Sequence, residues 1–300
     1  MRSVKVFGAI VALVLLAGAL ATGCGGPALG AGPDLTIGSI GWTENVAVSN
    51  LTKVVMEDDL GYENVELQLV EDEPELLFEG VKDGDLDTFQ DVWMPNHKEF
   101  LAEVEDDTEH LEPWFRGTTR FSMAAPDYMD IESMEEIRST GATRIYGIEP
   151  GAVIMDKIPN QAIPDYGLEQ QLVASSTPAM LYEVDRMYRN EEPFIFVAWS
   201  PHWMNQEYDF TYLEDPKGSL GDLTEPAEIS TIVRQDLQEE DPVAYAFLNA
   251  LTLTEDQVNR LELEIRDSDD DPAEGARRWL QDNRAAAQPW ISAAKRAQEG

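Results

Sequence analysis

The chain is nearly without cysteine. Its single cysteine, Cys24, lies near the start of the 300-residue sequence. The sequence after residue 24 therefore cannot form a disulfide within itself, hold zinc through thiolates or use a thiolate nucleophile. Basic residues are also scarce, because 21 lysines and arginines stand against 58 acidic residues. The net charge of −37 repels nucleic acid phosphates and offers anionic lipids no polybasic surface, so we exclude both as partners.

Long apolar runs are missing except at the start of the chain. Two basic residues precede an apolar segment, residues 6–20, which is short for a membrane span and typical of a secretory leader. The sequence Ala-Thr-Gly-Cys that ends at Cys24 resembles the lipobox of bacterial lipoproteins. We therefore expect residues 1–23 to be a signal peptide and Cys24 to be lipidated. Residues 24–33, which are rich in Gly, Pro and Ala, would form a tether to the outer face of the membrane, or the protein would be periplasmic.

The acidic residues are spread over almost every segment, which is typical of a solvated surface. Removing residues 1–23, which hold two basic residues and no acid, takes the formal charge from −37 to −39. Self-repulsion of this size is tolerable where salt screens it. The composition therefore indicates a halophilic protein.

Apolar runs and amphipathic stretches alternate from residue 34 onward, which predicts an α/β protein with mostly parallel sheets flanked by helices. The expected strands are residues 35–40, 65–70, 86–92, 143–148, 168–173, 194–199 and 229–233. The expected helices are residues 46–60, 73–82, 152–157, 178–189, 256–263 and 276–294.

This order predicts two lobes. Residues 34–122 would form the first part of lobe I and residues 123–225 lobe II. Residues 226–300 would return to lobe I, with a strand that joins its sheet and then C-terminal helices. Residues 121–126 are expected to be an extended crossing, and two crossings would make a hinge.

Three tryptophans, Trp42, Trp93 and Trp199, stand at or just after the ends of expected strands. Ligands of open α/β sheets bind beyond the carboxyl ends of the strands. Three indoles in that position therefore predict an aromatic box. An indole face is the best aromatic partner for a cation, and a quaternary ammonium has no N–H that needs another kind of partner. The pattern predicts a betaine-like ligand.

Three motifs include these tryptophans, and a fourth stands apart from them in the sequence. They are Gly-Trp-Thr-Glu at 41–44, Asp-Val-Trp-Met-Pro-Asn-His at 91–97, Gly-Ile-Glu-Pro-Gly-Ala-Val-Ile-Met at 147–155 and Trp-Ser-Pro-His-Trp-Met at 199–204. Together they make the chain similar to the glycine betaine/proline betaine substrate-binding proteins of ABC importers. The resemblance implies a two-lobed, hinged periplasmic-binding-protein fold of the type II kind. It also implies a monomer outside the cytoplasm that captures glycine betaine, or a related compatible solute, for an ABC transporter permease, without cofactor or catalysis.

The resemblance also implies a binding site. In the family three tryptophans surround the trimethylammonium group, and their counterparts here are Trp42, Trp93 and Trp199. A histidine and two backbone N–H groups hold the carboxylate, and their counterparts are His97 and the amides of Val153 and Ile154. The loop before residue 153 also precedes an expected helix start, whose free N–H groups favour an anion. A protonated His97 would add a charge-assisted hydrogen bond.

Two other functions remain open. A choline or carnitine carrier of the same importer class would use the same aromatic box, although choline has no carboxylate for His97, Val153 and Ile154 to hold. An extracellular hydrolase of quaternary amines would need a nucleophile with its base, and no serine stands in such an arrangement. The three histidines lack paired spacing, so we expect no metal site. His202 is expected to hydrogen-bond the loop that presents Trp199.

Overall fold

The computed structural model describes residues 34–71, 73–269 and 271–299. The predicted signal peptide, the predicted lipidation site Cys24 and the predicted tether all lie outside the described residues. Within the described ranges, no helix is both long and apolar enough to cross a bilayer.

The first of two five-stranded sheets has the order β2-β1-β3-β11-β4. Its strands are β1 (Asp34–Ser39), β2 (Asn64–Leu69), β3 (Thr88–Met94), β4 (Thr108–His110) and β11 (Glu228–Arg234). β1 pairs in parallel with β2 and β3, whereas β11 runs antiparallel to β3 and β4. The expected return of residues 229–233 to the first sheet is confirmed.

The second sheet has the order β10-β6-β9-β7-β8. Its strands are β6 (Arg120–Pro126), β7 (Arg144–Tyr146), β8 (Gln171–Val173), β9 (Ile195–Ser200) and β10 (Phe210–Tyr212). β7 pairs in parallel with β8 and β9, while β6 runs antiparallel to β9 and β10. β5 (Phe115–Arg116) and β12 (Leu253–Thr254) form a separate parallel pair.

Both sheets are therefore mixed, which corrects the expectation of mostly parallel pairing. The physical reason is the crossing of the chain between the sheets. The strand that enters each sheet from the other, β6 or β11, runs against its neighbours. Residues 121–126, expected only as an extended crossing, lie within β6.

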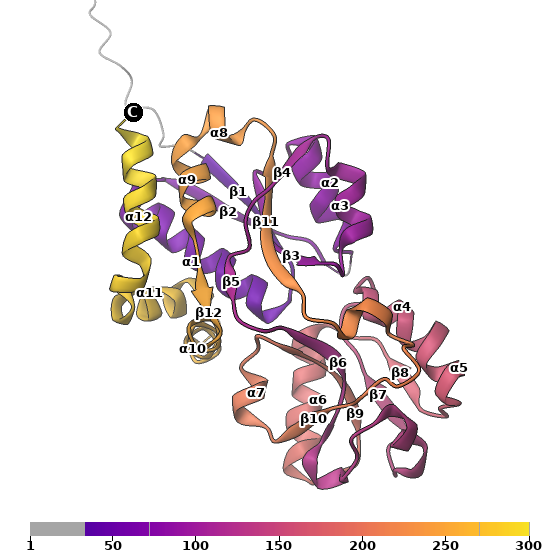
Figure 1. Ribbon diagram of the computed structural model, residues 1–300. Coiled ribbons are helices and arrows are strands. Elements are labelled where there is room, and N and C mark those ends of the chain that lie inside the picture. Colours follow the sequence, from indigo (N-terminus) through magenta and orange to yellow (C-terminus); the bar gives the residue numbers. More distant parts are fainter. Residues whose placement is uncertain (1–33, 72, 270, 300) are drawn as a thin grey trace, which may run out of the picture. The chain divides into compact units, whose positions relative to one another are not determined.

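Helices pack on both sheets. Those of the first sheet are α1 (Thr43–Leu60), α2 (Glu75–Asp83), α3 (Lys98–Val104), α8 (Leu237–Glu240), α9 (Pro242–Ala250), α10 (Glu255–Arg266), α11 (Pro272–Asp282) and α12 (Arg284–Gln298). Those of the second sheet are α4 (Val153–Lys157), α5 (Ile163–Tyr166), α6 (Thr177–Arg189) and α7 (Met204–Glu207). We call the first sheet with its helices lobe I and the second lobe II (Figure 1).

The predicted helix over residues 276–294 is wrong in one respect, because two helices, α11 and α12, cover it. Asn283 lies between them, and both its backbone N–H and its side-chain amide donate to the carbonyl of Trp279. A side chain that competes for a helix carbonyl ends the helix there. The apolar spacing resumes in α12, so the sequence pattern does not reveal the break.

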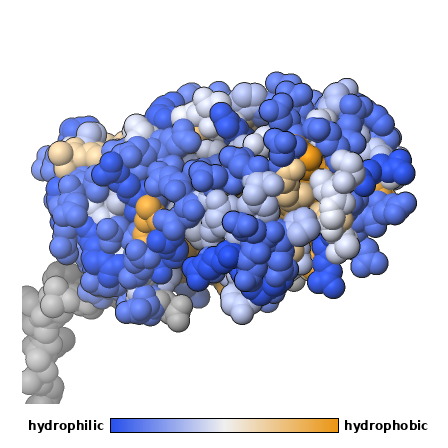
Figure 2. Space-filling model, turned by 90° about the horizontal axis from the view of Figure 1, so that it is seen from below, coloured by the Kyte–Doolittle hydropathy of each residue, from blue (hydrophilic) through white to orange (hydrophobic). Residues whose placement is uncertain are grey.

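The chain connects the lobes twice, between β5 and β6 and between β10 and β11 (Figure 1). The predicted boundary at residues 122 and 123 falls inside β6, and the boundary at residues 225 and 226 falls just before β11. The face shown in Figure 2 is mostly hydrophilic with small apolar areas, in keeping with the excess of acidic residues.

Candidate ligand-binding site

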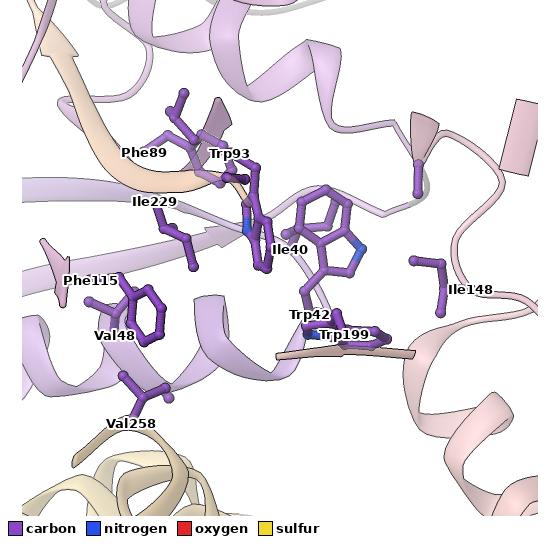
Figure 3. Packing of buried hydrophobic residues seen from close by; sticks show 14 of the residues in the cluster. Ile40, Trp42, Val48, Phe89, Trp93, Phe115, Ile148, Trp199, Ile229 and Val258 are labelled. Carbon is purple, nitrogen blue, oxygen red and sulfur yellow. The ribbon is translucent and has the colours of Figure 1, made fainter. Parts of the chain in front are cut away.

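The ends of three strands bring the three predicted indoles together. Trp42 lies between β1 and α1, Trp93 lies near the end of β3, and Trp199 lies on β9 of lobe II. Figure 3 shows the three side chains close to one another, with Ile148 of lobe II facing them. Their exposed fractions are 6%, 5% and 2%, so the rings are almost completely removed from solvent.

The three indoles line one cavity. Small-molecule sites are mainly apolar with a few polar groups. The other residues that line the cavity are Glu44, Asn96, His97, Phe121, Ile148, Ala152 and Val153. The cavity therefore has aromatic walls from both lobes and a small number of polar side chains.

Each of the three indole N–H groups donates to a buried carboxylate. Trp93 Nε1 lies 2.9 Å from Asp91 Oδ1, in the same strand. Trp199 Nε1 lies 2.8 Å from Glu44 Oε2, and Trp42 Nε1 lies 3.0 Å from Glu149 Oε2. These hydrogen bonds fix the ring orientations.

The carboxylates behind the cavity have little solvent to stabilise their charge. Burial, with repulsion from Glu149 as a smaller cause, raises the pKa of Glu44 to about 7. Burial and the neighbouring charge of Glu44 raise the pKa of Asp91 well above its ordinary value, and the same two causes act on Glu262. Their positions favour a cation nearby, because a positive charge stabilises their ionised forms.

His97 lies in the cavity wall, with its ring stacked on Trp42 at a centroid distance of 5.8 Å. Its Nδ1 accepts the backbone N–H of Trp93 at 3.2 Å, and burial lowers the pKa of the ring to about 3. The imidazole is therefore neutral and carries its proton on Nε2. The charge-assisted hydrogen bond that a protonated ring would add is therefore not available, because the buried site disfavours the charged form.

Val153 and Ile154 open α4, so their N–H groups are among those that a helix leaves without an intrahelical partner. The structure places them differently with respect to the cavity. Val153 contributes to its lining, whereas Ile154 is fully buried and is not a lining residue.

His202 is held within the turn that follows Trp199, as expected. Its Nδ1 accepts the N–H of Met204 at 3.0 Å, and its ring lies edge-on to Trp199 at 4.7 Å. Its Nε2 lies 2.8 Å from Thr43 Oγ1 of lobe I. Among the residues that the structure describes, no cluster of His, Cys, Asp or Glu has the arrangement of a metal site.

Reasoning from the sequence missed several residues of the site. Phe121 packs against Trp93, with 6.2 Å between the ring centroids, and belongs to the cavity wall. Glu44, Asp91 and Glu149 all lie within the motifs quoted above. Glu44 and Asp91 stand two residues from a tryptophan, and Glu149 follows β7 by three residues. The signal for them was an acid beside an apolar run, which 58 acidic residues in the chain obscure.

Comparison with known proteins gives the family. Residues 33–282 match the family described as the substrate binding domain of ABC-type glycine betaine transport system. The chain belongs to this family. The motifs around Trp42, Trp93 and Trp199 all lie inside the matched range.

A curated relative is the glycine betaine/carnitine transport binding protein GbuC of Listeria monocytogenes. It is 36% identical over 149 residues, which are 49% of this chain and 48% of that protein. The chain thus spans about half the length of this relative.

Two solved structures share the fold. Lactococcal OpuAC, crystallised closed with glycine betaine, has a TM-score of 0.76 and 28% identity, over 86% of this chain and 99% of that chain. The glycine/betaine/L-proline-binding protein ProX of Borrelia burgdorferi has a TM-score of 0.78 and 24% identity, over 88% of this chain and 99% of that chain. The two-lobed periplasmic-binding-protein fold is therefore confirmed.

Proposed function

We propose that this protein captures glycine betaine, or a closely related quaternary ammonium solute, and delivers it to an ABC importer. The observation that supports this most is the single cavity lined by indoles from both lobes. Trp42 and Trp93 come from lobe I and Trp199 from lobe II. Family membership favours transport over catalysis.

The aromatic faces suit a methylated cation. A desolvated cation on an indole gains on the order of 2 kcal/mol, so three faces supply a large part of the roughly 8 kcal/mol that micromolar affinity needs. Glu44 and Asp91, hydrogen-bonded to two of these indoles, add negative potential when they are ionised, and a bound cation favours their ionised forms. A neutral ligand of the same shape gains neither contribution.

The carboxylate of the ligand would meet neutral donors. His97 offers Nε2–H to the cavity wall, and Val153 and Ile154 offer the N–H groups at the start of α4. A helix start with free N–H groups is a favourable place for an anion. We assign these three residues to the carboxylate, with the side chain of Ile154 serving only the packing.

A second candidate is a hydroxylated quaternary ammonium solute, such as choline or carnitine. Asn96 lines the cavity, and its Oδ1 is buried without a donor among the described residues. A ligand hydroxyl could donate to it, whereas glycine betaine has no hydroxyl. Carnitine has both a hydroxyl and a carboxylate.

The test is a calorimetric titration with glycine betaine, proline betaine, carnitine and choline. The matched control ligand is 3,3-dimethylbutanoate, which replaces the quaternary nitrogen of glycine betaine by carbon and so removes only the positive charge. We expect micromolar glycine betaine binding and at least about 100-fold weaker binding of the carbon analogue. Equal affinity for the two would reject the cation cage.

We further propose that Cys24 is lipidated and that the protein acts as a monomer outside the cytoplasm, with the lipid as its only membrane contact. Labelling of cells with a radioactive fatty acid should mark the protein, and Cys24→Ala should abolish the label.

If the protein is a carrier, bound ligand should be recovered chemically unchanged. Recovery of a hydrolysis product would instead support the hydrolase alternative.

A further inference from the structure

Two of the three cage indoles make hydrogen bonds across the lobes, and they do so reciprocally. Trp42 of lobe I donates to Glu149 of lobe II at 3.0 Å. Trp199 of lobe II donates to Glu44 of lobe I at 2.8 Å. All four side chains are at most 6% exposed. The same rings that line the cavity therefore also join the two lobes.

Each acceptor is fixed in its own lobe at the start of a helix. Glu149 accepts the N–H of Thr177 at 2.7 Å and its hydroxyl at 2.9 Å, and Thr177 is the first residue of α6. Glu44 lies in the first turn of α1. A carboxylate is stabilised at a helix N-terminus by the helix dipole. Each acceptor carboxylate is thus positioned by residues of its own lobe.

The third indole provides a contrast within the same cage. Trp93 donates to Asp91 of its own strand, so its hydrogen bond does not depend on the position of lobe II.

Burial makes the two cross-lobe hydrogen bonds stronger than an exposed contact. The ion pair between Lys98 and Asp222 is such an exposed contact, because the two side chains are 54% and 64% exposed.

We propose that Glu44 and Glu149 are positioning residues that latch the closed lobes through the indoles of Trp199 and Trp42. Closing the lobes and completing the cage are then one event, because neither indole can keep its hydrogen bond when the lobes separate. The consequence for affinity rests on the proposed function, since a ligand that needs both indoles binds only the closed form.

The backbone around the latch is closely fitted. A Cβ atom added at Gly41 would lie 3.2 Å from Glu149 Oε1, closer than an ordinary contact. Glu149 is held by Thr177 and Trp42 and has little freedom to move away. Gly41→Ala would therefore wedge the lobes apart without altering any cage side chain.

The experiment measures lobe separation without ligand. In the chain carrying Cys24→Ser, spin labels at Gln68→Cys on β2 and Tyr182→Cys on α6 report the distance between the lobes by pulsed electron paramagnetic resonance. Gln68 and Tyr182 are exposed. The test variants are Glu149→Gln, Glu44→Gln and Gly41→Ala, and the matched control is Asp91→Asn.

At pH 8, where Glu44 is ionised, we expect the ligand-free protein to populate a closed form. Glu44→Gln and Glu149→Gln should each lower the closed-to-open ratio about tenfold, as loss of the charge on a buried hydrogen-bond acceptor predicts. Gly41→Ala should lower the ratio as well, because its methyl group would meet Glu149 Oε1. Asp91→Asn should leave that ratio within about twofold. The same test can be made on the hydrogen-bond donors. Trp42→Phe and Trp199→Phe should lower the closed-to-open ratio, whereas Trp93→Phe, the control, should not.

The latch is rejected if the ligand-free protein shows no closed form, or if the control variants shift the ratio as much as the test variants. A second titration with glycine betaine separates the two proposals. Failure of the unaltered protein to bind any quaternary ammonium solute would reject the proposed function, and the ligand-free distances would still decide the latch.

Discussion

At the scale of the residue, each cage tryptophan uses two parts of its side chain for different purposes. The ring lines the cavity, and the N–H donates to a buried acid. Such a hydrogen bond to an anion leaves more electron density on the ring, which strengthens the attraction between the ring face and a cation. Replacing a tryptophan therefore removes both a wall and an anchor.

Trp93→Ala should raise the Kd for glycine betaine by about 100-fold, because loss of one desolvated indole costs about 3 kcal/mol. Isothermal calorimetry measures this directly. Tyr182→Ala, at an exposed position on α6 that is not part of the cavity wall, serves as the control and should bind as before. An unchanged affinity of Trp93→Ala would contradict the cage.

His97→Ala should weaken glycine betaine binding about tenfold and choline binding by less than about twofold, since only glycine betaine has a carboxylate for Nε2–H. The ratio of the two affinities, measured by titration, isolates the effect on the carboxylate. Equal losses for both ligands would remove His97 from this role.

Glu44 should make stability depend on pH. Its pKa is about 7 in the folded protein and near 4.5 when unfolded, so between these values only the folded state keeps the proton. This contribution to stability is fully present below pH 4.5 and is lost as the pH rises to about 7, in total about 3 kcal/mol. Calorimetry should show that, between pH 5 and 8, the Tm of the ligand-free protein falls more steeply than the Tm of ligand-free Glu44→Gln. Parallel curves would argue against a raised pKa.

At the scale of the element, the helices behind lobe I approach closely. A Cβ atom at Gly275 of α11 would lie 2.5 Å from the Cα of Ile265 in α10. α10 and α11 also pack against α1, which carries Glu44 near its start. The absence of a side chain at Gly275 therefore helps to position the helix behind the cavity.

Gly275→Ala should lower the free energy of unfolding by about 2 kcal/mol, because the added methyl group meets backbone atoms that cannot rotate away. Urea denaturation measures the change. Gln281→Ala, at an exposed position of the same helix, should change stability by less than about 0.5 kcal/mol. If the two variants are equally stable, the close packing of α10 and α11 is not real.

Local patterns predicted most elements correctly but not their pairing. The expected strands at 35–40 and 86–92 correspond to β1 and β3 within a few residues. Residues 121–126 are not recognisable as a strand of lobe II from the sequence, because the partners of β6 are β9 and β10, about seventy to ninety residues later in the chain. No local periodicity contains that information.

The candidate site shows the same limit. Strand ends and motifs located Trp42, Trp93, Trp199 and His97, which the structure brings to one cavity. The neutral state of His97 could not be predicted, since it follows from burial. The acids that hold the indoles could not be recognised either, because a buried acid and a surface acid look alike in the sequence.

At the scale of the whole molecule, the charge of −37 and the enclosed cavity should respond differently to salt. Screening reduces repulsion between surface acids, so the Tm should rise between 0.1 and 2 M KCl. The contacts with the ligand are short and shielded, so the Kd for glycine betaine should change by less than about threefold over the same range. Loss of binding in molar salt would contradict an enclosed site.

The reciprocal indole contacts between the lobes also have an optical consequence. Indole emission depends on the polarity around the ring and on charged neighbours, and Trp42 and Trp199 exchange buried carboxylates for water when the halves part. The protein should therefore change its ultraviolet fluorescence as solute arrives. With no dye attached, it would serve as a gauge of the osmolyte concentration around it.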